Sequence, residues 1–593
     1  MREMIKRLSF GGRLPVAPSM DGTLTRAHVP SRTGMIDRSV IINCALAVAL
    51  AVVASLAAQF LAHLIGFFTN LFFYHRIALE FVPPFEAPDW GWWVIPVPVV
   101  GGLIVGVMAR YGSKAIRGHG IPEAMEQILT NESRIPLRVT FLKPISAAIS
   151  IGTGGPFGAE GPIIATGAAL GSVTGQWLKT TADTRKCLLA AGAAAVLLAV
   201  ELLLFEFRPR SLIPVALAAA TAEAMHMIFE GTKPVFPMGA FPDLAPSAFL
   251  FAIAIGLVMG LVSVVVTKIV YGIEDAFEHL PVHWMWWPAL GGLAVGVVGY
   301  FFPRTMGVGY GNIVDVISGN VAPMALAIFT LMKFISWSVS LGSGTSGGTL
   351  APLFTIGGGI GALIGFAVQA MFPELGITPG IAGLIGMASI FAGASRALLA
   401  SVVFAFEVTQ QPMGLMPLLA GCSVAYLVSG YLMRNSIMTE KIARRGVRIP
   451  ADYTADLLDQ VLVRDFARMD VVTLMADQEV DPLIPAILAH DAPYTHQGYP
   501  VLDEQGKCLG IVTRKDFARA AASKGMKVRE LIARDPIAVF ASQSLREAAD
   551  LMVVEGVGRV PVMDVDKGKM IGILSRTDLL RAHEARLKSL RRG

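Results

Sequence analysis

The sequence predicts an all-α polytopic membrane protein with an inverted repeat and broken, re-entrant helices, followed by a soluble α/β tail. Hydrophobic residues make up 54% of the 593-residue chain and charged residues only 16%, whereas average soluble domains carry about a quarter charged residues. Long stretches between residues 40 and 433 are nearly free of charge, and the part after 451 has a soluble composition. Clusters of Gly and Pro interrupt the apolar stretches. These observations indicate one part in lipid, with irregular chain inside it, and one part in water.

The predicted membrane part, residues 39–445, consists of apolar runs of very different lengths. A straight spanning helix needs roughly 20 apolar residues, and several runs are too short or too rich in Gly to cross alone. The runs are 40–60, 92–109, 138–151, 187–205, 211–229, 247–271, 285–302, 322–341, 350–371, 379–394 and 415–433. We therefore expect full spans mixed with shorter intramembrane helices.

Basic residues flank the apolar part on both sides. Residues 1–38 hold seven Lys or Arg against three acids, without the apolar core and cleavage site of a signal peptide. The loop 434–448 is basic as well. By the positive-inside rule, both termini are predicted to be cytoplasmic. We expect a multi-pass protein of the cell (inner) membrane, in contact with the lipid bilayer.

Several other classes of protein are not favoured by the sequence. The net charge of +5 comes from the basic flanks, so no nucleic-acid partner is expected. The four cysteines lack metal spacing or a disulfide pattern, and we expect them to be packing residues, with no metal site. The chain shows no His-Glu-x-x-His or Gly-x-Ser-x-Gly arrangement, so an enzyme is not expected.

Three Gly/Pro clusters mark the expected site: residues 118–123, 152–162 and 342–352. Non-helical chain at membrane depth has to be enclosed by protein or line a water-filled path. Each cluster precedes an apolar stretch with Pro near its first turn, so each is expected to expose a helix N-terminus, whose free N–H groups attract anions. The last two clusters occupy corresponding places in two halves, as in inverted-repeat transporters. The alternative, glycines that only permit close helix packing, is less favoured for three such breaks.

The three motifs resemble, in the same order, the signature stretches of the CLC family of chloride channels and chloride/proton exchangers. They are Gly-His-Gly-Ile-Pro-Glu at 118–123, Gly-Ala-Glu-Gly-Pro at 158–162 and Gly-Gly-Thr-Leu-Ala-Pro at 347–352. The resemblance covers roughly residues 40–445. It implies transport of chloride or a similar small anion, by a gated channel that works as a homodimer with one path in each subunit. It also identifies Glu160 as the gating glutamate, whose carboxylate competes with the anion.

The resemblance further implies which residues line the anion path. The candidate anion-binding residues are Gly118, His119, Gly120, Gly158, Gly161, Thr349, Leu350 and Met438. Lys143 is expected to set a positive field along the path, and a lysine that snorkels at a helix end is the alternative. For Glu160 the alternative is an ordinary first-turn acid, but an ionisable group in an apolar membrane segment favours the gate.

The chain departs from the family pattern at several positions. His119 and Met438 stand where the family commonly has a serine and a tyrosine that donate to the central chloride. Leu202, directly after Glu201, stands where exchangers carry a second, intracellular-side glutamate. Leu202 therefore favours a passive channel over the alternative, a chloride/proton antiporter. The stretch 191–201 is about three helical turns shorter than in the family, and we expect this to perturb a helix near the dimer interface.

The predicted soluble domain, 446–593, contains two copies of one unit, residues 461–520 and 527–585, at an offset of 61 to 65 residues. The copies resemble CBS motifs and predict a cytoplasmic α/β CBS pair that regulates transport. No cofactor is required, but such motifs often bind an adenine nucleotide. The candidate nucleotide-binding residues are Thr513, Asp516, Ser575 and Asp578. Alternatively, these residues simply cap helices. A CBS-regulated divalent-cation pathway is a weaker alternative, because the membrane part has few acids.

Overall fold

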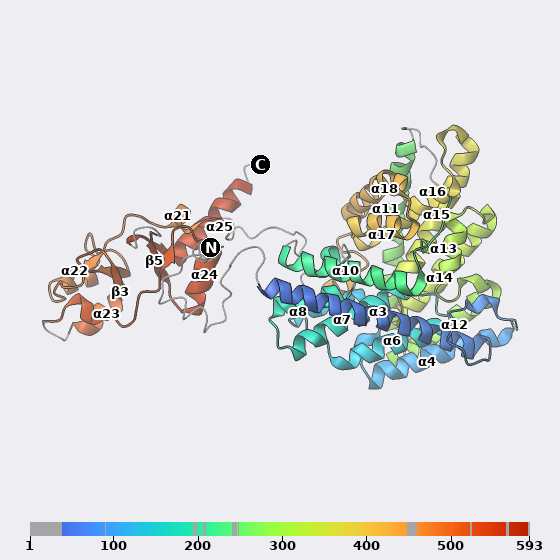
Figure 1. Cartoon of the computed structure of the whole chain (residues 1–593), viewed down its shortest axis with the longest axis horizontal. Coiled ribbons are helices and arrows are strands. Elements are labelled where there is room, and N and C mark those ends of the chain that lie inside the picture. Colours follow the sequence, from blue (N-terminus) through green and yellow to red (C-terminus); the bar gives the residue numbers. More distant parts are fainter. Residues whose placement is uncertain are drawn as a thin grey trace, which may run out of the picture. The chain divides into compact units, whose positions relative to one another are not determined.

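The protein is described by a computed structural model that covers residues 38–88, 90–193, 198–204, 209–239, 246, 248–447, 458, 461–521, 525–564 and 569–590. The described residues form two compact units, one before and one after residue 451. Figure 1 shows a helical first unit and a mixed second unit. The basic segment predicted over residues 1–38 lies, apart from Arg38, outside the described residues.

The first unit is built from helices of very different lengths. In chain order these are α3 (Arg38–Phe73), α4 (Pro96–Tyr111), α5 (Ile121–Thr130), α6 (Leu137–Gly152), α7 (Glu160–Trp177), α8 (Ala182–Gly192), the π-helical η4 (Ala199–Leu204), α10 (Pro209–Glu230), α11 (Ala248–Glu278), α12 (Trp287–Phe301), α13 (Tyr310–Ile317), α14 (Pro323–Gly342), α15 (Leu350–Met371), α16 (Pro379–Ser395), α17 (Leu398–Thr409), α18 (Leu415–Leu432) and α19 (Glu440–Arg444). Among the described residues, seven helical stretches are long and apolar enough to cross a membrane. The prediction of a helical, multi-pass membrane fold is confirmed.

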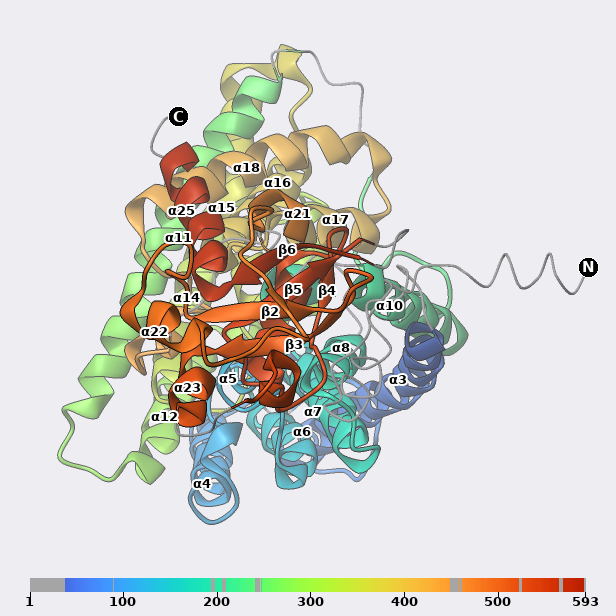
Figure 2. The same ribbon diagram turned by 90° about the vertical axis from the view of Figure 1, so that its left-hand side faces the viewer.

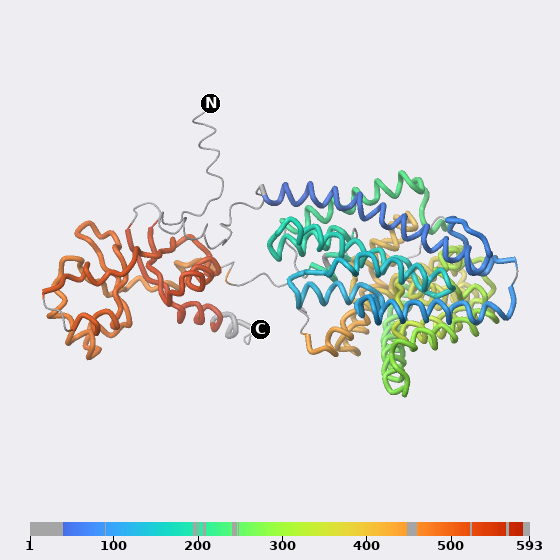
Figure 3. Tube along the Cα trace, turned by 90° about the horizontal axis from the view of Figure 1, so that it is seen from below, coloured from blue at the N-terminus to red at the C-terminus, as the bar shows by residue number. Residues whose placement is uncertain are grey.

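Some helices differ from the predicted apolar runs. The run 40–60 is only the first part of α3, which continues to Phe73 and lies alongside α10 (Figure 3). The run 187–205 is not one helix, because α8 ends at Gly192 and a π-helical segment follows at Ala199–Leu204. Part of the shortened stretch 191–201 lies outside the described residues, so its predicted effect stays a prediction.

The two halves of this unit meet at a short backbone ladder. Gly158 N–H donates to Gly348 O at 3.3 Å, and Gly348 N–H donates to Gly158 O at 3.0 Å. A Cβ on Gly348 would lie 2.5 Å from Gly158 O, so only glycine permits this approach. Because the two glycines precede α7 and α15, the ladder joins two broken-helix motifs, one from each half, as an inverted repeat requires.

Glycines also serve plain helix packing elsewhere in the unit. A Cβ on Gly361 of α15 would lie 2.3 Å from Ala382 O of α16, and a Cβ on Gly386 would lie 2.4 Å from Gly357 O. Small residues thus let the backbones of α15 and α16 approach closely, which is a common device in membranes. The packing role proposed as an alternative for the three motifs therefore applies to other glycines of the same chain.

The second unit contains two copies of one small α/β fold, as the repeat predicts. Its strands are β1 (Leu474–Met475), β2 (Gly498–Leu502), β3 (Cys508–Thr513), β4 (Val539–Phe540), β5 (Arg559–Met563) and β6 (Met570–Ser575), and its helices include α21 (Val463–Phe466), α22 (Leu483–Ala489), α23 (Arg514–Ala520), α24 (Leu545–Val554) and α25 (Arg576–Leu590). The sheets have the orders β1-β2-β3 and β4-β5-β6, each with one parallel and one antiparallel pairing (Figure 2). Both middle strands shift register near their ends, after Val501 and Val562.

Candidate anion pathway

Glu160 is the first residue of α7 and lies beside the glycine ladder. The polar groups that reach its carboxylate are the backbone N–H groups of Glu160 and Ala351 and the hydroxyl of Tyr310. Its Oε2 atom is buried and has no hydrogen-bond partner among the described residues. A Cβ on Gly158 would lie 2.0 Å from that oxygen, so the carboxylate fills the space that the glycine leaves open. The acid therefore occupies the position where the N-termini of α7 and α15 come together.

The other predicted residues of this region lie around the same point. Thr349 and Leu350 are the N-cap and first residue of α15, and the Thr349 hydroxyl is buried without a partner in the described part of the chain. A Cβ on Gly161 would lie 2.5 Å from His119 O and 3.0 Å from Gly348 Cα. Gly161 therefore brings the turn before α5 against the first turn of α7.

The turn at Gly118 to Gly120 is held to the third motif by the backbone. Gly118 N–H donates to Thr345 O at 3.1 Å, and Gly118 and Gly120 adopt φ values of 92° and 93°, which favour glycine. The Glu123 carboxylate accepts a hydrogen bond from Gly120 N–H at 2.8 Å and pairs with Lys441 at 2.8 Å. All three predicted motifs are thus brought together.

Lys143 lies within α6 and is 1% exposed, so it does not extend to a surface as a snorkelling lysine would. Its ammonium donates to Ile116 O at 2.9 Å and to Gly118 O at 2.7 Å. These bonds direct the carbonyl groups of the turn toward Lys143. A buried ammonium at this place both fixes the turn and adds positive charge next to it.

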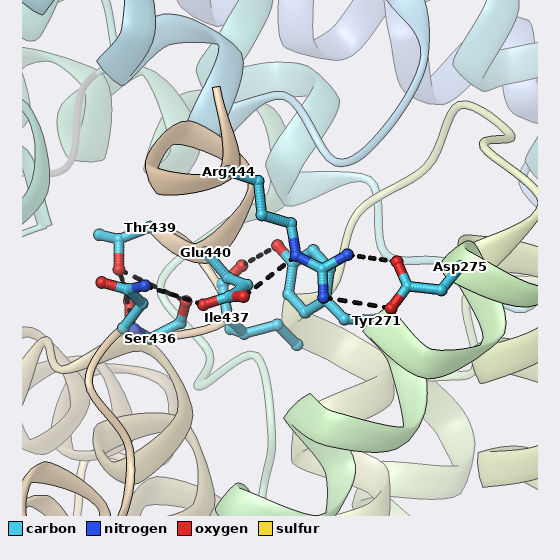
Figure 4. Close-up of polar contacts among 8 residues, drawn as sticks. Tyr271, Asp275, Ser436, Ile437, Thr439, Glu440 and Arg444 are labelled. Carbon is cyan, nitrogen blue, oxygen red and sulfur yellow. Dashed lines mark hydrogen bonds and ion pairs between the residues drawn. The ribbon is translucent and has the colours of Figure 1, made fainter. Parts of the chain in front are cut away.

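His119 and Met438 occupy different environments. His119 is 5% exposed, its Nδ1 has no partner among the described residues, and it lines a cavity of about 710 Å³. Met438 is fully buried in the apolar core. Tyr271 of α11 also lines the cavity, and its hydroxyl donates to Ile437 O at 2.8 Å (Figure 4). A tyrosine from another helix therefore contacts the backbone directly before Met438.

Figure 4 also shows how the segment after α18 is fixed near this tyrosine. The Arg444 guanidinium lies over the Tyr271 ring at 4.9 Å from its centroid. It hydrogen-bonds to the carboxylates of Asp275 and Glu440. The side chain of Arg444 thus joins α11 to α19 at the edge of the cavity.

Glu201 is a helix cap in this structure. Its carboxylate accepts hydrogen bonds from Leu399 N–H and Ala400 N–H, both at 2.8 Å, at the N-terminus of α17. Leu202, which stands where exchangers carry their second glutamate, is 3% exposed and belongs to the apolar core. The position therefore offers no titratable side chain.

Sequence reasoning missed a second turn that mirrors the one before α5. Gly307 and Gly309 precede α13 with φ values of 69° and 81°. Lys333, 0% exposed, donates to Thr305 O at 3.0 Å and to Gly307 O at 3.1 Å. The available signal was a self-comparison of the sequence, because Lys333 lies 190 residues after Lys143, as Gly348 does after Gly158. Tyr310, the first residue of α13, was also missed from the sequence.

The predicted nucleotide residues make the contacts of helix caps. Thr513 N–H and Oγ1 donate to Asp516 Oδ2 at 2.8 and 2.6 Å. Ser575 N–H and Oγ donate to Asp578 Oδ2 at 2.9 and 2.5 Å. Asp578 is fully buried, whereas Asp516 is 26% exposed at its side chain. The capping contacts exist in both copies, and nucleotide binding stays a prediction.

A multi-pass helical unit whose broken helices direct N–H groups at one buried point belongs to the class of membrane transport proteins for small anions. The family model for voltage gated chloride channels matches residues 101–430, and the CBS domain model matches residues 463–523 and 528–585. The chain therefore belongs to the voltage-gated chloride channel (CLC) family and carries a CBS pair. The predicted family and its anion transport activity are confirmed.

Curated relatives are similar to this chain in sequence, and solved structures are similar to it in fold. A ClcB-like protein of Ralstonia nicotianae is 26% identical over 370 residues, which is 60% of this chain and 86% of the relative. An H(+)/Cl(-) exchange transporter ClcA of Salmonella paratyphi B is 26% identical over 364 residues, 57% of this chain and 76% of the relative. A slow cyanobacterial Cl-/H+ antiporter has a similar fold, with a TM-score of 0.61 and 20% identity over 68% of this chain and 97% of its own. A eukaryotic CLC transporter covers 90% of this chain and 97% of its own, with a TM-score of 0.56 and 21% identity.

Proposed function

We propose that the protein conducts chloride, or a similar small anion, through a pathway that Glu160 opens and closes. The observation that carries this proposal is the place of the Glu160 carboxylate, beside the backbone N–H groups of Glu160 and Ala351. The N-termini of α7 and α15 stabilise one negative charge there without a fixed counter-ion. The carboxylate and a permeating anion therefore compete for one position. Protonation removes the charge of Glu160 and favours the anion.

The proposed channel is not coupled to protons. The Glu201 carboxylate is engaged in capping α17, and Leu202 lies in the apolar core and has no titratable group, which favours a pathway without proton coupling. A chloride/proton antiporter is the second candidate, because a relative is named an H(+)/Cl(-) exchange transporter. The two candidates differ in whether a proton gradient alone moves chloride.

We also infer the setting in which this pathway works. The basic flanks of the membrane part favour cytoplasmic termini in an inner-membrane protein. The family resemblance supports a homodimer with one pathway in each subunit. Light scattering in detergent, which measures the mass of the protein assembly, would test this. The relatives are named as channels or exchange transporters, which supports transport rather than catalysis of a covalent step.

Regulation by an adenine nucleotide at the CBS pair belongs to the same proposal. Asp516 supports it better than Asp578, because its side chain is 26% exposed. A nucleotide that binds the folded chain raises its melting temperature by mass action. Millimolar ATP should therefore raise the melting temperature of the detergent-solubilised chain, and Asp516→Ala should abolish the rise. If ATP did not change the melting temperature of the parent chain, the helix-cap interpretation of these residues would stand.

The decisive test of transport uses purified protein in liposomes. We expect chloride efflux when a potassium ionophore dissipates the membrane potential, and a reversal potential that follows the chloride gradient alone. A reversal potential that also moves with a pH gradient would establish the antiporter. The absence of chloride flux in vesicles that contain folded protein would refute the proposed function.

A further inference from the structure

Helices α4 and α12 lie side by side and antiparallel, with their backbones in close approach (Figure 1). A Cβ on Gly296 of α12 would lie 2.2 Å from the carbonyl oxygen of Ile95, directly before α4. At the other end of the pair, a Cβ on Gly106 of α4 would lie 2.1 Å from Met285 O. The C-terminal end of α4 therefore lies beside the N-terminal end of α12, and the two helices present one joint surface.

Each helix of this pair exposes apolar side chains at helical spacing, which we call the apolar stripes. They are Ile104, Val107 and Tyr111 on α4, and Leu290, Leu293 and Val297 on α12. The stretch Trp92–Tyr111 is long and apolar enough to cross a membrane, so we assign the stripes to the lipid-facing surface. Tyr111, at the end of α4, and the exposed Trp286, directly before α12, are of the aromatic type that is enriched at the level of the lipid headgroups.

Two basic side chains lie at this end of the helix pair, against neighbouring rings of one loop. The Arg110 guanidinium lies 5.6 Å from the centroid of the Tyr111 ring, and its Nη1 atom lies 2.8 Å from Nε2 of His283. The Lys114 ammonium lies 5.4 Å from the centroid of the Trp284 ring. Because the ring centroids of His283 and Trp284 are 5.1 Å apart, the two positive charges belong to one patch.

No acid in the described part of the chain neutralises this patch by contact. Arg110 and Lys114 are both exposed, and neither forms an ion pair with another described residue. Glu278, at the end of α11, lines the same cavity as Lys114, but the two make no ion pair among the residues that the structure describes. The positive end of the α12 dipole lies at the same end of the helix pair. Both charges are therefore available to an anion from outside the chain.

The patch lies on the side of the membrane unit where α19 is found. Lys114 lines one cavity with Lys441 and Arg444 of α19, the last described helix of the membrane unit. With the cytoplasmic termini proposed above, this side faces the cytoplasmic leaflet, whose anionic lipids attract basic residues. The choice of leaflet rests on the proposed function, whereas the binding of a lipid does not.

We propose that the adjoining ends of α4 and α12 bind an anionic phospholipid, such as phosphatidylglycerol. Its phosphate accepts hydrogen bonds from Arg110, whose planar guanidinium matches the geometry of phosphate, and Lys114 adds a second positive charge. Its acyl chains lie along the apolar stripes. A water-soluble phosphate ester would use the two charges but not the stripes, so a lipid is the occupant that fits both features.

The test measures lipid binding to the purified full chain in detergent by native mass spectrometry. Phosphatidylglycerol and phosphatidylcholine with identical acyl chains are titrated separately. A basic residue near an anionic lipid surface strengthens binding about fivefold, so the two residues should make phosphatidylglycerol bind about thirtyfold more tightly than phosphatidylcholine. Arg110→Gln and Lys114→Gln should each lose about fivefold of this preference, and the double variant should lose all of it.

The matched control removes two exposed basic residues elsewhere on the membrane unit, Arg138 of α6 and Lys268 of α11. Arg138→Gln/Lys268→Gln should keep the preference for phosphatidylglycerol. Equal loss in the control would show that any positive charge suffices and would overturn the site. Equal binding of both lipids to the parent, or a preference that Arg110→Gln/Lys114→Gln keeps, would overturn it as well.

Two further outcomes separate this proposal from its neighbours. Displacement of phosphatidylglycerol by millimolar inorganic phosphate would show that the patch takes a free phosphate group, which overturns the lipid assignment. The binding measurement needs no chloride flux. A chain that binds phosphatidylglycerol through Arg110 and Lys114 but conducts no chloride would support the lipid site and refute the proposed function.

Discussion

Lys143 and Lys333 hold equivalent turns in the two halves of the membrane unit. Each ammonium is buried and donates to two backbone carbonyl groups, those of Ile116 and Gly118 for Lys143 and those of Thr305 and Gly307 for Lys333. Each lysine thereby fixes a Gly-x-Gly turn that precedes a short helix, α5 or α13. The inverted repeat is preserved at the level of single hydrogen bonds.

Replacing either lysine by methionine should destabilise the protein. Lys143→Met leaves Ile116 O without the lysine donor and Gly118 O with the 3.4 Å bond from Gly347 N–H, and Lys333→Met removes the lysine donor from Thr305 O and Gly307 O. A buried carbonyl group that is left without a donor costs about 1–3 kcal/mol. We expect lower melting temperatures for Lys143→Met and Lys333→Met in detergent, and little change for the exposed Lys114→Met. A Lys143→Met protein that melts like the parent but loses chloride flux would show that the charge acts on transport without supporting the turn.

Replacing Glu160 by Gln should open the pathway. Glutamine keeps the volume of the side chain and removes the negative charge that competes with the anion for the helix termini. We expect larger chloride flux in liposomes and a loss of its activation by low external pH. If Glu160 only stabilised α7, the substitution would lower the stability of the protein by about 1 kcal/mol or less. Chloride flux would then respond to pH as in the parent.

The ion pair between Lys441 and Glu123 should contribute to stability through coupling. The two side chains are 19% and 15% exposed and lie 2.8 Å apart. Removing one partner of a buried pair costs about 3–5 kcal/mol, and this partly exposed pair should fall below that range. In a double-mutant cycle with Lys441→Met and Glu123→Gln, the double variant should lose less stability than the sum of the singles. Additive losses in melting experiments would mean that the pair is not coupled.

The two aspartate caps of the CBS pair should differ in strength. Asp578 is fully buried and lies 3.5 Å from Arg468 and 3.3 Å from Arg581, whereas Asp516 is partly exposed. Loss of a cap costs about 0.5–2 kcal/mol, so Asp578→Ala should accelerate hydrogen exchange in α25 more than Asp516→Ala does in α23. Equal effects would show that burial adds nothing to the cap at Asp578.

Much of this architecture could be predicted from the sequence. In lipid every backbone N–H and C=O group needs a partner, so an apolar chain that is broken by Gly and Pro can adopt few structures. The motifs around Glu160 meet as expected. The position of Tyr271 at the cavity was not predicted, since its hydroxyl contacts Ile437, which lies far away in the chain. Lys333 was missed although its signal exists, because its equivalence to Lys143 is visible only when the two halves of the sequence are aligned.

The two carboxylate oxygens of Glu123 connect two elements of the membrane unit. Oε2 accepts from Gly120 N–H, in the turn that carries His119, and Oε1 accepts from Lys441 of α19, the last described helix of the membrane unit. A displacement of α19 therefore also moves the turn that carries His119, which lines the cavity. A displacement of about 1 Å takes a hydrogen bond out of its normal range of length. Through the two oxygens of Glu123, the position of α19 and the shape of the cavity lining depend on each other.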